Sequence, residues 1–257
     1  MDYEQILYTV AADEHLARVT LNRPDKRNPL SPALLGEVAH ALGRARDDAA
    51  VRVVILTGAG QAFSAGGDLA AMGQSQQNGL TSSFVDLNLL IARLGKPVIA
   101  MVNGPALAGG FGLMLSCHLV VAADTAVFGT PEINVGLWPM TIMAVIFRNV
   151  GRKPGMELIL TGEKIDAAAA LRLGLVNRVV PAARLEAETL ALAASLAAKS
   201  PAVMKLGLDA FAAAADLALE PALRHLEQQF FALLGTEDAK EGLTAFLQKR
   251  APVWKGK

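Results

Sequence analysis

The sequence predicts an α/β protein in which a mostly parallel sheet is followed by an all-helical C-terminal region. In the first half of the chain, short runs rich in Val, Ile and Leu alternate with helical patterns, and Gly, Pro, Asn or Asp bounds each run. These runs are almost continuously apolar, as expected of parallel strands that are buried on both faces. From about Glu157 onward the strand signals fade, and Ala-rich helical patterns replace them.

The predicted elements follow from these local patterns. Strands are expected at residues 16–21, 51–57, 97–102 and 119–123. Between the first two, a helix is expected over 32–47, where apolar side chains recur at helical spacing and Ser31 with Pro32 provides an N-cap and first turn. Further helices are expected at 167–173, 185–199, 202–215, 221–234 and 237–249. We therefore expect a β/α core over residues 1–195 and a helical region over 196–257.

The composition excludes several classes of protein. The chain has 257 residues, 53% of them hydrophobic, and its 24 Lys and Arg balance 24 Asp and Glu. So apolar a chain is not disordered, and it lacks the basic excess of a nucleic-acid binder. Its single cysteine, Cys117, excludes a disulfide framework and fits a reducing compartment. Because no apolar run reaches the roughly 18–20 residues that span a bilayer, and the N-terminus lacks a signal-peptide pattern, we expect a cytoplasmic protein with no nucleic-acid or membrane partner.

Two segments share one pattern, in which an apolar strand leads through a turn to a pair of glycines at the start of a helix. Gly66 and Gly67 follow one strand, and Gly109 and Gly110 follow the next. Paired glycines allow close backbone approach, and amides at a helix start have no helical partner. Two such turns that converge would offer two N–H donors to one oxygen, as in an oxyanion hole. Taken singly, such a pair is more often only a tight strand-to-helix connection, and neither has the spacing of a nucleotide-binding loop.

An ordered series of motifs makes the sequence similar to the enoyl-CoA hydratase/isomerase family, also called the crotonase superfamily, almost from end to end. The motifs lie at residues 21–30 (LNRPDKRNPL), 56–58 and 62–69 (LTG and AFSAGGDL), 96–100 and 108–110, 128–132 (FGTPE), 160–163 (LTGE), 174–181 and 241–250. The resemblance implies a crotonase-like spiral of ββα units whose C-terminal helices drive trimers that pair into hexamers. It also implies an acyl-CoA thioester as substrate, with no cofactor beyond the coenzyme A of that substrate.

The resemblance further implies which residues form the site. The backbone amides of Gly67 and Gly109 would hold the thioester oxygen, where losing one fixed donor typically costs about 10²–10³ in rate. The other implied substrate contacts are Ala65, Gly66, Asp68 and Leu69 along the CoA arm, Lys26, Arg27 and Asn28 near its nucleotide end, and Gly110, Pro131, Leu137 and Trp138. Trp138 is equally compatible with a wall of the acyl pocket and with a plain core position.

Enolate chemistry also needs a group that takes and returns a proton. Glu132 occupies the position of the family's second catalytic glutamate, and we expect its basicity to be set by the apolar Ile133, Val135 and Leu137 around it. Where family hydratases carry their first glutamate, this chain has Gly112, which cannot transfer a proton. None of the four histidines is spaced as a metal ligand, so no metal site is expected.

The missing glutamate affects the predicted reaction. Family hydratases divide the activation of water and the protonation of the α carbon between two carboxylates. Shifting a double bond from the β,γ to the α,β position needs one base alone, so a single Glu132 favours isomerisation. Three alternatives stay open: a hydratase with a different second group, another thioester reaction such as hydrolysis or decarboxylation, and an acyl-CoA-binding protein with little activity.

Overall fold

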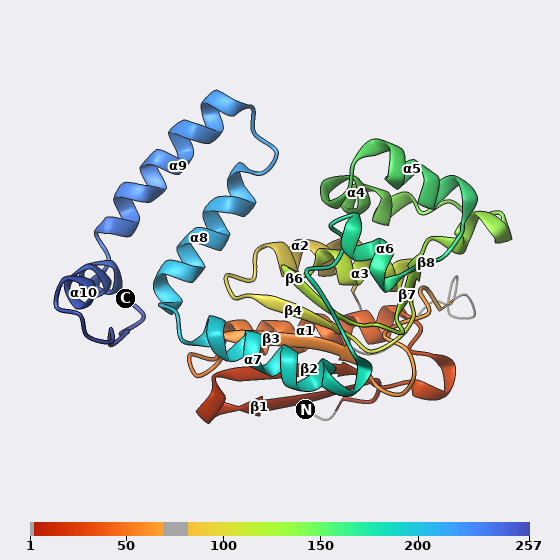
Figure 1. Ribbon diagram of the computed structural model, residues 1–257, viewed down its shortest axis with the longest axis horizontal. Coiled ribbons are helices and arrows are strands. Elements are labelled where there is room, and N and C mark those ends of the chain that lie inside the picture. The colour runs from red at the N-terminus through yellow and green to blue at the C-terminus, as the bar shows by residue number, and fades with distance from the viewer. Residues whose placement is uncertain (1–2, 69–81) are drawn as a thin grey trace.

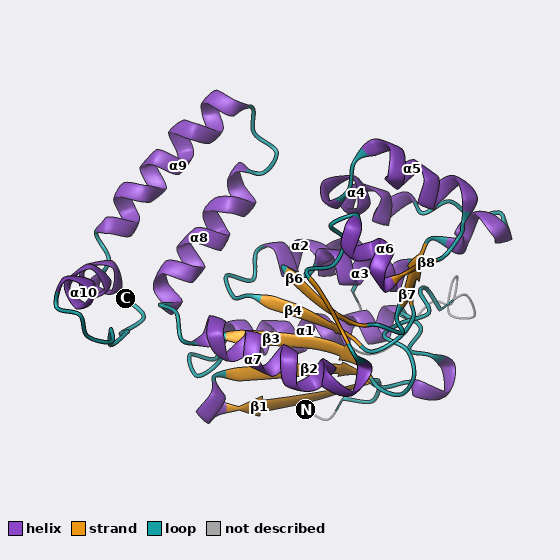
Figure 2. Cartoon of the chain, viewed as in Figure 1, coloured by secondary structure: helices purple, strands orange, loops and turns teal. Residues whose placement is uncertain are grey.

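The computed structural model describes residues 3–68 and 82–257 of the chain. Figures 1 and 2 show a central sheet with helices on both faces, a group of short helices at one end, and a helical arm that projects from the opposite end. The mixed α/β architecture and the C-terminal helices confirm the predicted fold class.

The main sheet contains six strands in the order β1-β2-β3-β4-β6-β9. Their bounds are β1 Ile6–Ala11, β2 Leu16–Leu21, β3 Val53–Gly58, β4 Val98–Val102, β6 Leu119–Ala123 and β9 Arg178–Val180. β1 pairs with β2 antiparallel, and every other pair is parallel, with Leu16 opposite Val53 and Val54 opposite Val98. The four strands expected from the sequence are therefore confirmed, and β1 and β9 extend the sheet at its two edges.

The prediction that strands end near Glu157 is wrong. β9 pairs with β6, and a second, three-stranded sheet in the order β5-β7-β8 consists of β5 Ala106–Leu107, β7 Val127–Gly129 and β8 Ile165–Asp166. Each of these strands has two or three residues. Segments so short show no alternation of apolar and polar residues, and they become strands only because a partner strand supplies the hydrogen bonds.

The strands carry alternating side chains into two separate apolar cores. On β3, Val54 and Leu56 belong to the larger core, whereas Val53 and Ile55 belong to the smaller one. The larger core is covered by α1 Pro32–Asp47, α2 Phe84–Ala92 and α3 Gly109–Ser116, and the smaller one by α7 Leu185–Ala197. Burial on both faces explains why the strands read as continuous apolar runs.

Helix α1 confirms the predicted bounds and the predicted cap. Ser31 Oγ accepts a hydrogen bond from the amide of Leu34 at 3.1 Å, and Pro32 occupies the first turn, where its missing N–H costs nothing. The remaining helices are α4 Met140–Asn149, α5 Arg152–Thr161, α6 Ala167–Arg172, α8 Pro201–Ala214, α9 Leu219–Leu234 and α10 Glu237–Leu247. Short 3₁₀ turns are η1 Ala12–Glu14, η2 Pro24–Lys26, η3 Pro131–Val135 and η4 Ala182–Arg184.

Helices α8, α9 and α10 form the projecting arm (Figure 1). The C-terminal tail closes its base, because Asp238 accepts hydrogen bonds from Ser200 Oγ at 2.6 Å and from the Lys255 amide at 2.7 Å. Trp254 Nε1 also donates to the carbonyl of Ala198 at 2.8 Å. The boundary expected between residues 195 and 196 falls inside the last turn of α7, a helix that covers the sheet. No helix in the described ranges is long and apolar enough to cross a membrane.

Candidate active site

The two glycine turns lie against each other beyond the ends of β3 and β4. Ser64 and Ala106 form a parallel bridge, and the Leu107 amide donates to the Ser64 carbonyl at 3.0 Å. A Cβ atom placed on Gly109 would lie 3.6 Å from the amide nitrogen of Gly67. A Cβ atom on Gly66 would lie 3.3 Å from the amide nitrogen of Gly109. The structure thus brings together the two turns that the sequence singled out.

The amides of Gly67 and Gly109 have no acceptor among the described residues. Gly67 forms a parallel bridge with Leu30, in which the Leu30 amide donates to Gly66 and the Asp68 amide donates to Leu30, so the Gly67 amide is left over. Gly109 is the first residue of α3, where an amide has no intrahelical partner and the helix dipole is positive. Two unused N–H groups on adjacent segments are the arrangement that an oxyanion hole requires.

Unusual backbone conformations hold this arrangement. Ala108, directly before Gly109, has φ 51° and ψ −127°, and its amide donates to the carbonyl of Gly129 at 2.9 Å. Gly66 has φ +101°, and a Cβ there would meet the Cβ of Ala108 at 2.6 Å. A non-glycine residue in such a conformation costs about 1–3 kcal/mol and persists only when its surroundings enforce it. Glycine at position 66 is therefore required by both conformation and space.

The side chain of Asn28 connects the loop at residue 23 to the segment that leads into the first glycine turn. Its side chain is completely buried, accepts from the Arg23 amide at 2.8 Å and donates to the carbonyls of Ala59 and Ala62 at 2.9 Å. A direct substrate contact by this side chain would require these bonds to break, so the structure gives it a supporting position. Lys26 and Arg27, in contrast, are exposed in the turn that precedes it.

Ser64 connects the two turns. Its hydroxyl donates to the Asn28 carbonyl at 2.8 Å and accepts from the Gly66 amide at 3.2 Å. A Cβ on Gly110 would lie only 2.6 Å from the Cβ of Ser64, so Gly110 allows α3 to approach this turn. Gly110 and Ser64 are both buried, and Gly110 therefore serves close packing.

An ion pair that the sequence did not reveal lies beside the first turn. Arg23 Nη1 and Asp68 Oδ2 are 2.7 Å apart, and their side chains are 21% and 14% exposed. Asp68 directly follows Gly67, so this pair ties the predicted donor to the loop that holds Asn28. Both residues lie in motifs noted above, but no sequence signal pairs positions so far apart in the chain. Leu69, the next predicted contact, lies outside the described residues.

Glu132 follows by three residues Gly129, whose carbonyl accepts the hydrogen bond of the Ala108 amide in the second turn. It sits in η3, its Oε2 atom is buried, and no described residue donates to that atom. Burial raises the pKa of the Glu132 carboxyl, although a backbone hydrogen bond opposes this effect. Of the three apolar neighbours expected to set this basicity, Ile133 is half-buried, whereas Val135 and Leu137 are 65% and 44% exposed.

The other predicted residues differ in their burial. Pro131, Trp138 and Ile133 are half-buried, Trp138 packs against the larger core, and Ala65 is exposed. Gly112 is buried in α3, one helical turn after Gly109.

Two further side chains, His118 and Cys117, have structural positions. Burial lowers the pKa of His118, whose Nδ1 accepts from the Val98 amide at 3.1 Å and therefore links β4 to the end of α3. Burial raises the pKa of the Cys117 thiol to about 12, which keeps it protonated and unreactive. Within residues 3–68 and 82–257, no group of three or more His, Cys, Asp or Glu side chains could hold a metal ion.

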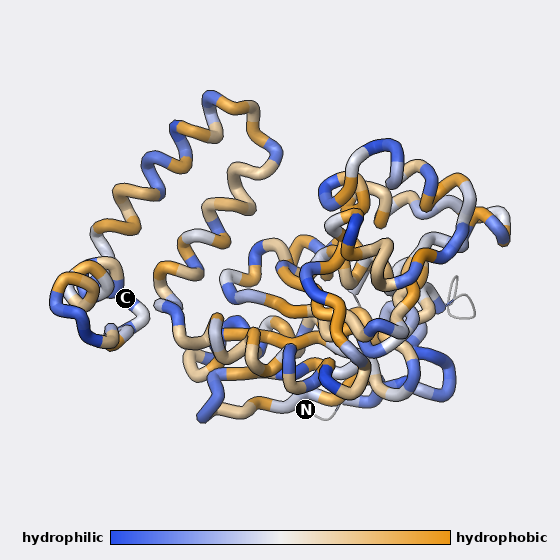
Figure 3. The backbone as a smooth tube through the Cα atoms, in the orientation of Figure 1, coloured by the Kyte–Doolittle hydropathy of each residue, from blue (hydrophilic) through white to orange (hydrophobic). Residues whose placement is uncertain are grey.

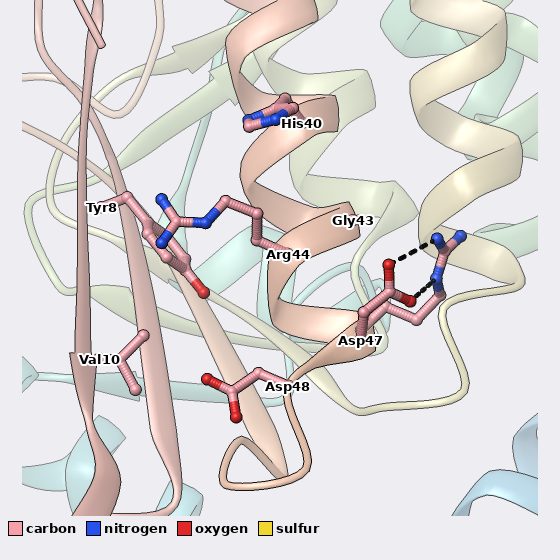
Figure 4. Close-up of a pocket in the computed structure, with 8 residues that line it drawn as sticks. Tyr8, Val10, His40, Gly43, Arg44, Asp47 and Asp48 are labelled. Atoms are coloured by element: carbon pink, nitrogen blue, oxygen red, sulfur yellow. Dashed lines mark hydrogen bonds and ion pairs between the residues drawn. The ribbon is translucent and has the colours of Figure 1, made fainter. Parts of the chain in front are cut away.

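A surface depression between β1 and α1 contains none of the predicted site residues. It is lined by Tyr8, His40, Arg44 and Asp48 among others, and Figure 4 shows the Arg44 guanidinium over the Tyr8 ring. The distance from the guanidinium carbon to the ring centre is 5.0 Å, typical of a cation–π contact.

Comparison with known proteins agrees with this geometry. The family model for enoyl-CoA hydratase/isomerase matches residues 11–257. The chain is 38% identical over 254 residues to a probable enoyl-CoA hydratase of Mycobacterium bovis, covering 98% of both chains. It is also 38% identical over 253 residues to the 2,3-dehydroadipyl-CoA hydratase of Escherichia coli, covering 96% of this chain and 98% of that one.

Solved structures show the same fold. The crystal structure of an enoyl-CoA hydratase from Mycobacterium smegmatis superposes with a TM-score of 0.91 at 36% identity, covering 98% of this chain and 99% of that one. Human enoyl-CoA hydratase domain-containing protein 3 gives a TM-score of 0.91 at 35% identity, covering 98% of this chain and all of the other. The fold and its paired glycine turns thus define an acyl-CoA-processing enzyme of the crotonase class. The chain belongs to the enoyl-CoA hydratase/isomerase family.

Proposed function

We propose that this protein moves the double bond of an enoyl-CoA thioester from the β,γ to the α,β position, with Glu132 as the only proton carrier. The Glu132 carboxylate takes the α proton, and the electrons of that C–H bond pass into the thioester to give an enolate. The amides of Gly67 and Gly109 hold the negative oxygen. Glu132 then returns the proton to the γ carbon as the double bond forms between the α and β carbons.

The observation that carries the proposal is the buried Oε2 atom of Glu132, which has no hydrogen-bond donor among the described residues. A buried polar atom without a partner is costly and rare in folded proteins, so its presence marks a group kept for a ligand. Desolvation raises the pKa of this carboxyl, which makes the ionised form a stronger base. The two unused glycine amides on the neighbouring segments supply the complementary charge stabilisation.

Coenzyme A recognition is proposed for the turn before Asn28. Lys26 and Arg27 are exposed there, and cationic side chains bind phosphate oxygens by charge-assisted hydrogen bonds. Asp68 is held by Arg23 and is less suited to this task, because a carboxylate repels phosphate. No cofactor other than the coenzyme A of the substrate enters the proposed reaction.

The test is the Glu132→Gln variant, assayed with a β,γ-enoyl-CoA. Gln keeps the size of the side chain but cannot take a proton, so we expect kcat for isomerisation to fall by about 10²–10⁴. The matched control is Glu163→Gln, which removes an exposed carboxylate and should leave kcat within about twofold. Unchanged isomerisation in Glu132→Gln would refute the proposed role.

Hydration is the second candidate, because the relatives at 38% identity are named hydratases. The same assay distinguishes the two reactions when formation of 3-hydroxyacyl-CoA from an α,β-enoyl-CoA is followed in parallel. A wild-type rate of hydration above that of isomerisation would favour a hydratase in which a different group assists Glu132. Binding of acyl-CoA without turnover of either substrate would favour a binding protein, and release of free coenzyme A would indicate another thioester reaction.

We also propose that the chain associates with itself as a trimer or hexamer through its helical arm. Helix α9 has no buried residue, and three of its large apolar side chains are mostly exposed. Leu219, Leu223 and Phe230 are 75%, 58% and 56% exposed. On α10, Phe246 and Leu247 are 81% and 80% exposed, and Figure 3 shows apolar segments along the arm. So large an exposed apolar surface is typical of a contact between subunits.

We place the enzyme in the cytoplasm, where its single thiol would stay reduced.

A further inference from the structure

Position 112 faces the same side of α3 as the predicted donor at 109. Residues three apart in a helix lie one above the other, so a side chain at 112 would extend from the helix just beyond the proposed thioester site. Gly112 is buried in the middle of this helix, where glycine is the poorest helix former except proline. Packing must therefore explain why this position has no side chain.

Two apolar side chains occupy the space beside Gly112. A Cβ on Gly112 would lie 2.8 Å from the Cβ of Ile142, nearer still to its Cγ2, and 3.0 Å from Cζ of Phe84. Ile142 lies on α4, is 3% exposed, and has a β-branched side chain that cannot rotate away easily. Phe84 is the first residue of α2 and is half-buried. Any side chain at 112 would have to displace Ile142.

The same segment positions both Ile142 and Glu132. Residues 131–135 form η3, the Leu137 amide donates to the Glu132 carbonyl at 3.0 Å, and α4 begins at Met140. The segment that carries the proposed base therefore leads directly into the helix whose Ile142 packs against Gly112. An apolar wall offers no hydrogen bonds to hold a water molecule in a reactive position.

We propose that Ile142, backed by Phe84, is a specificity-determining residue that excludes water from the Gly112 side of the site and so directs the enzyme to isomerisation. This inference rests on the proposed function. Hydration needs the oxygen of a water molecule to bond to the β carbon while the α carbon gains a proton and the double bond is lost. With Ile142 in place, no water reaches this side, and the proton taken by Glu132 returns to the substrate at the γ carbon.

The first experiment compares Ile142→Ala with Ile146→Ala, which removes the same atoms from a fully buried position one turn further along α4. For each variant, isomerisation of a β,γ-enoyl-CoA and hydration of an α,β-enoyl-CoA are measured. We expect the ratio of hydration to isomerisation to rise about tenfold in Ile142→Ala and to stay within about twofold in Ile146→Ala. Both variants should lower the melting temperature by about 5–10 °C. If Ile142→Ala does not fold, Ile142→Val is measured, with a smaller rise expected.

A second experiment tests the packing without depending on turnover. Gly112→Ala should lower the melting temperature of the wild type, because Ile142 leaves no room for a methyl group. In the Ile142→Ala background the same substitution should be neutral or raise the melting temperature, because alanine favours the helix. Gly112→Glu should add hydration only in the Ile142→Ala background, where the carboxylate has space.

The outcomes separate this inference from the proposed function. An unchanged ratio in Ile142→Ala, with isomerisation still dependent on Glu132, would overturn the role of Ile142 and leave the proposed function intact. Hydration gained by Gly112→Glu alone, with a wild-type melting temperature, would show that Ile142 does not block the position. Isomerisation that persists in Glu132→Gln, or a wild type without turnover, would refute the proposed function and the inference together.

Discussion

Glu132 shows how one residue acquires its chemistry from its surroundings. In the sequence it is a glutamate after a proline, with no feature that distinguishes it from a solvated carboxylate except its place in a family motif. In the structure its Oε2 atom is buried without a donor among the described residues, and the pKa of the carboxyl rises. The neighbours expected to cause this effect, Val135 and Leu137, are exposed. Its burial, and not a feature of the local sequence, therefore distinguishes it.

The raised pKa of Glu132 predicts how activity and stability depend on pH. As a base, Glu132 works only when ionised, so kcat/KM should fall as the pH drops through a pKa above the usual 4.5. The folded protein binds this proton more tightly than the unfolded chain does, so the free energy of unfolding should decrease as the pH rises from the unfolded to the folded pKa. Glu132→Gln should remove this contribution and raise the melting temperature at pH 7. A lower melting temperature in that variant at pH 7, measured by calorimetry, would contradict this account.

At the scale of elements, the two glycine turns differ in what their glycines do. Gly66 is required by the backbone itself, since its φ is +101° and the Cβ of Ala108 leaves it no room. Gly109 has an ordinary helical position, and the nearest atoms to a Cβ there would be Leu30 Cδ1 at 3.4 Å and the Gly67 amide nitrogen at 3.6 Å, both ordinary contact distances. One glycine therefore serves the fold, and the other keeps open the space between the two proposed donors.

This difference predicts opposite results for two alanine substitutions. Gly66→Ala should reduce the free energy of unfolding by about 1–3 kcal/mol or more, because it forces a non-glycine residue into a positive φ. Gly109→Ala should leave the melting temperature near that of wild type but lower kcat about 10-fold to 10³-fold, because its methyl group would cover the Gly67 amide. Urea unfolding and steady-state kinetics measure the two effects. Full activity in Gly109→Ala would argue against a thioester oxygen bound between these amides.

At the scale of the whole molecule, the helical arm is difficult to explain for an isolated chain. Its base is fixed by Asp238 and Trp254, yet long apolar side chains on α9 and α10 contact little of the same chain. Burying a leucine or phenylalanine contributes about 1.5–3 kcal/mol, so a second copy that covers these residues would gain substantial stability.

The proposed assembly predicts that a charge in this surface separates the subunits. Phe230→Asp, at a side chain 56% exposed on α9, should reduce the mass measured by light scattering toward that of the 26.9 kDa chain. The matched control is Gln228→Glu, which adds a negative charge at an exposed polar position of the same helix and should not change the mass. A wild-type protein that is already monomeric would contradict the proposed assembly.

Local pattern alone determined much of the architecture. The strands at 16–21 and 119–123 and the helix at 32–47 have the predicted bounds, because continuous apolar runs and the Ser31 cap act over a few neighbouring residues. The same reading found the paired glycines and the family motifs. Tertiary structure alone decided the short strands β5, β7, β8 and β9, the burial of Glu132, the pairing of Arg23 with Asp68 and the packing of Ile142 against Gly112. Each of these depends on contacts between residues far apart in the chain, which leave no periodic signal in the sequence.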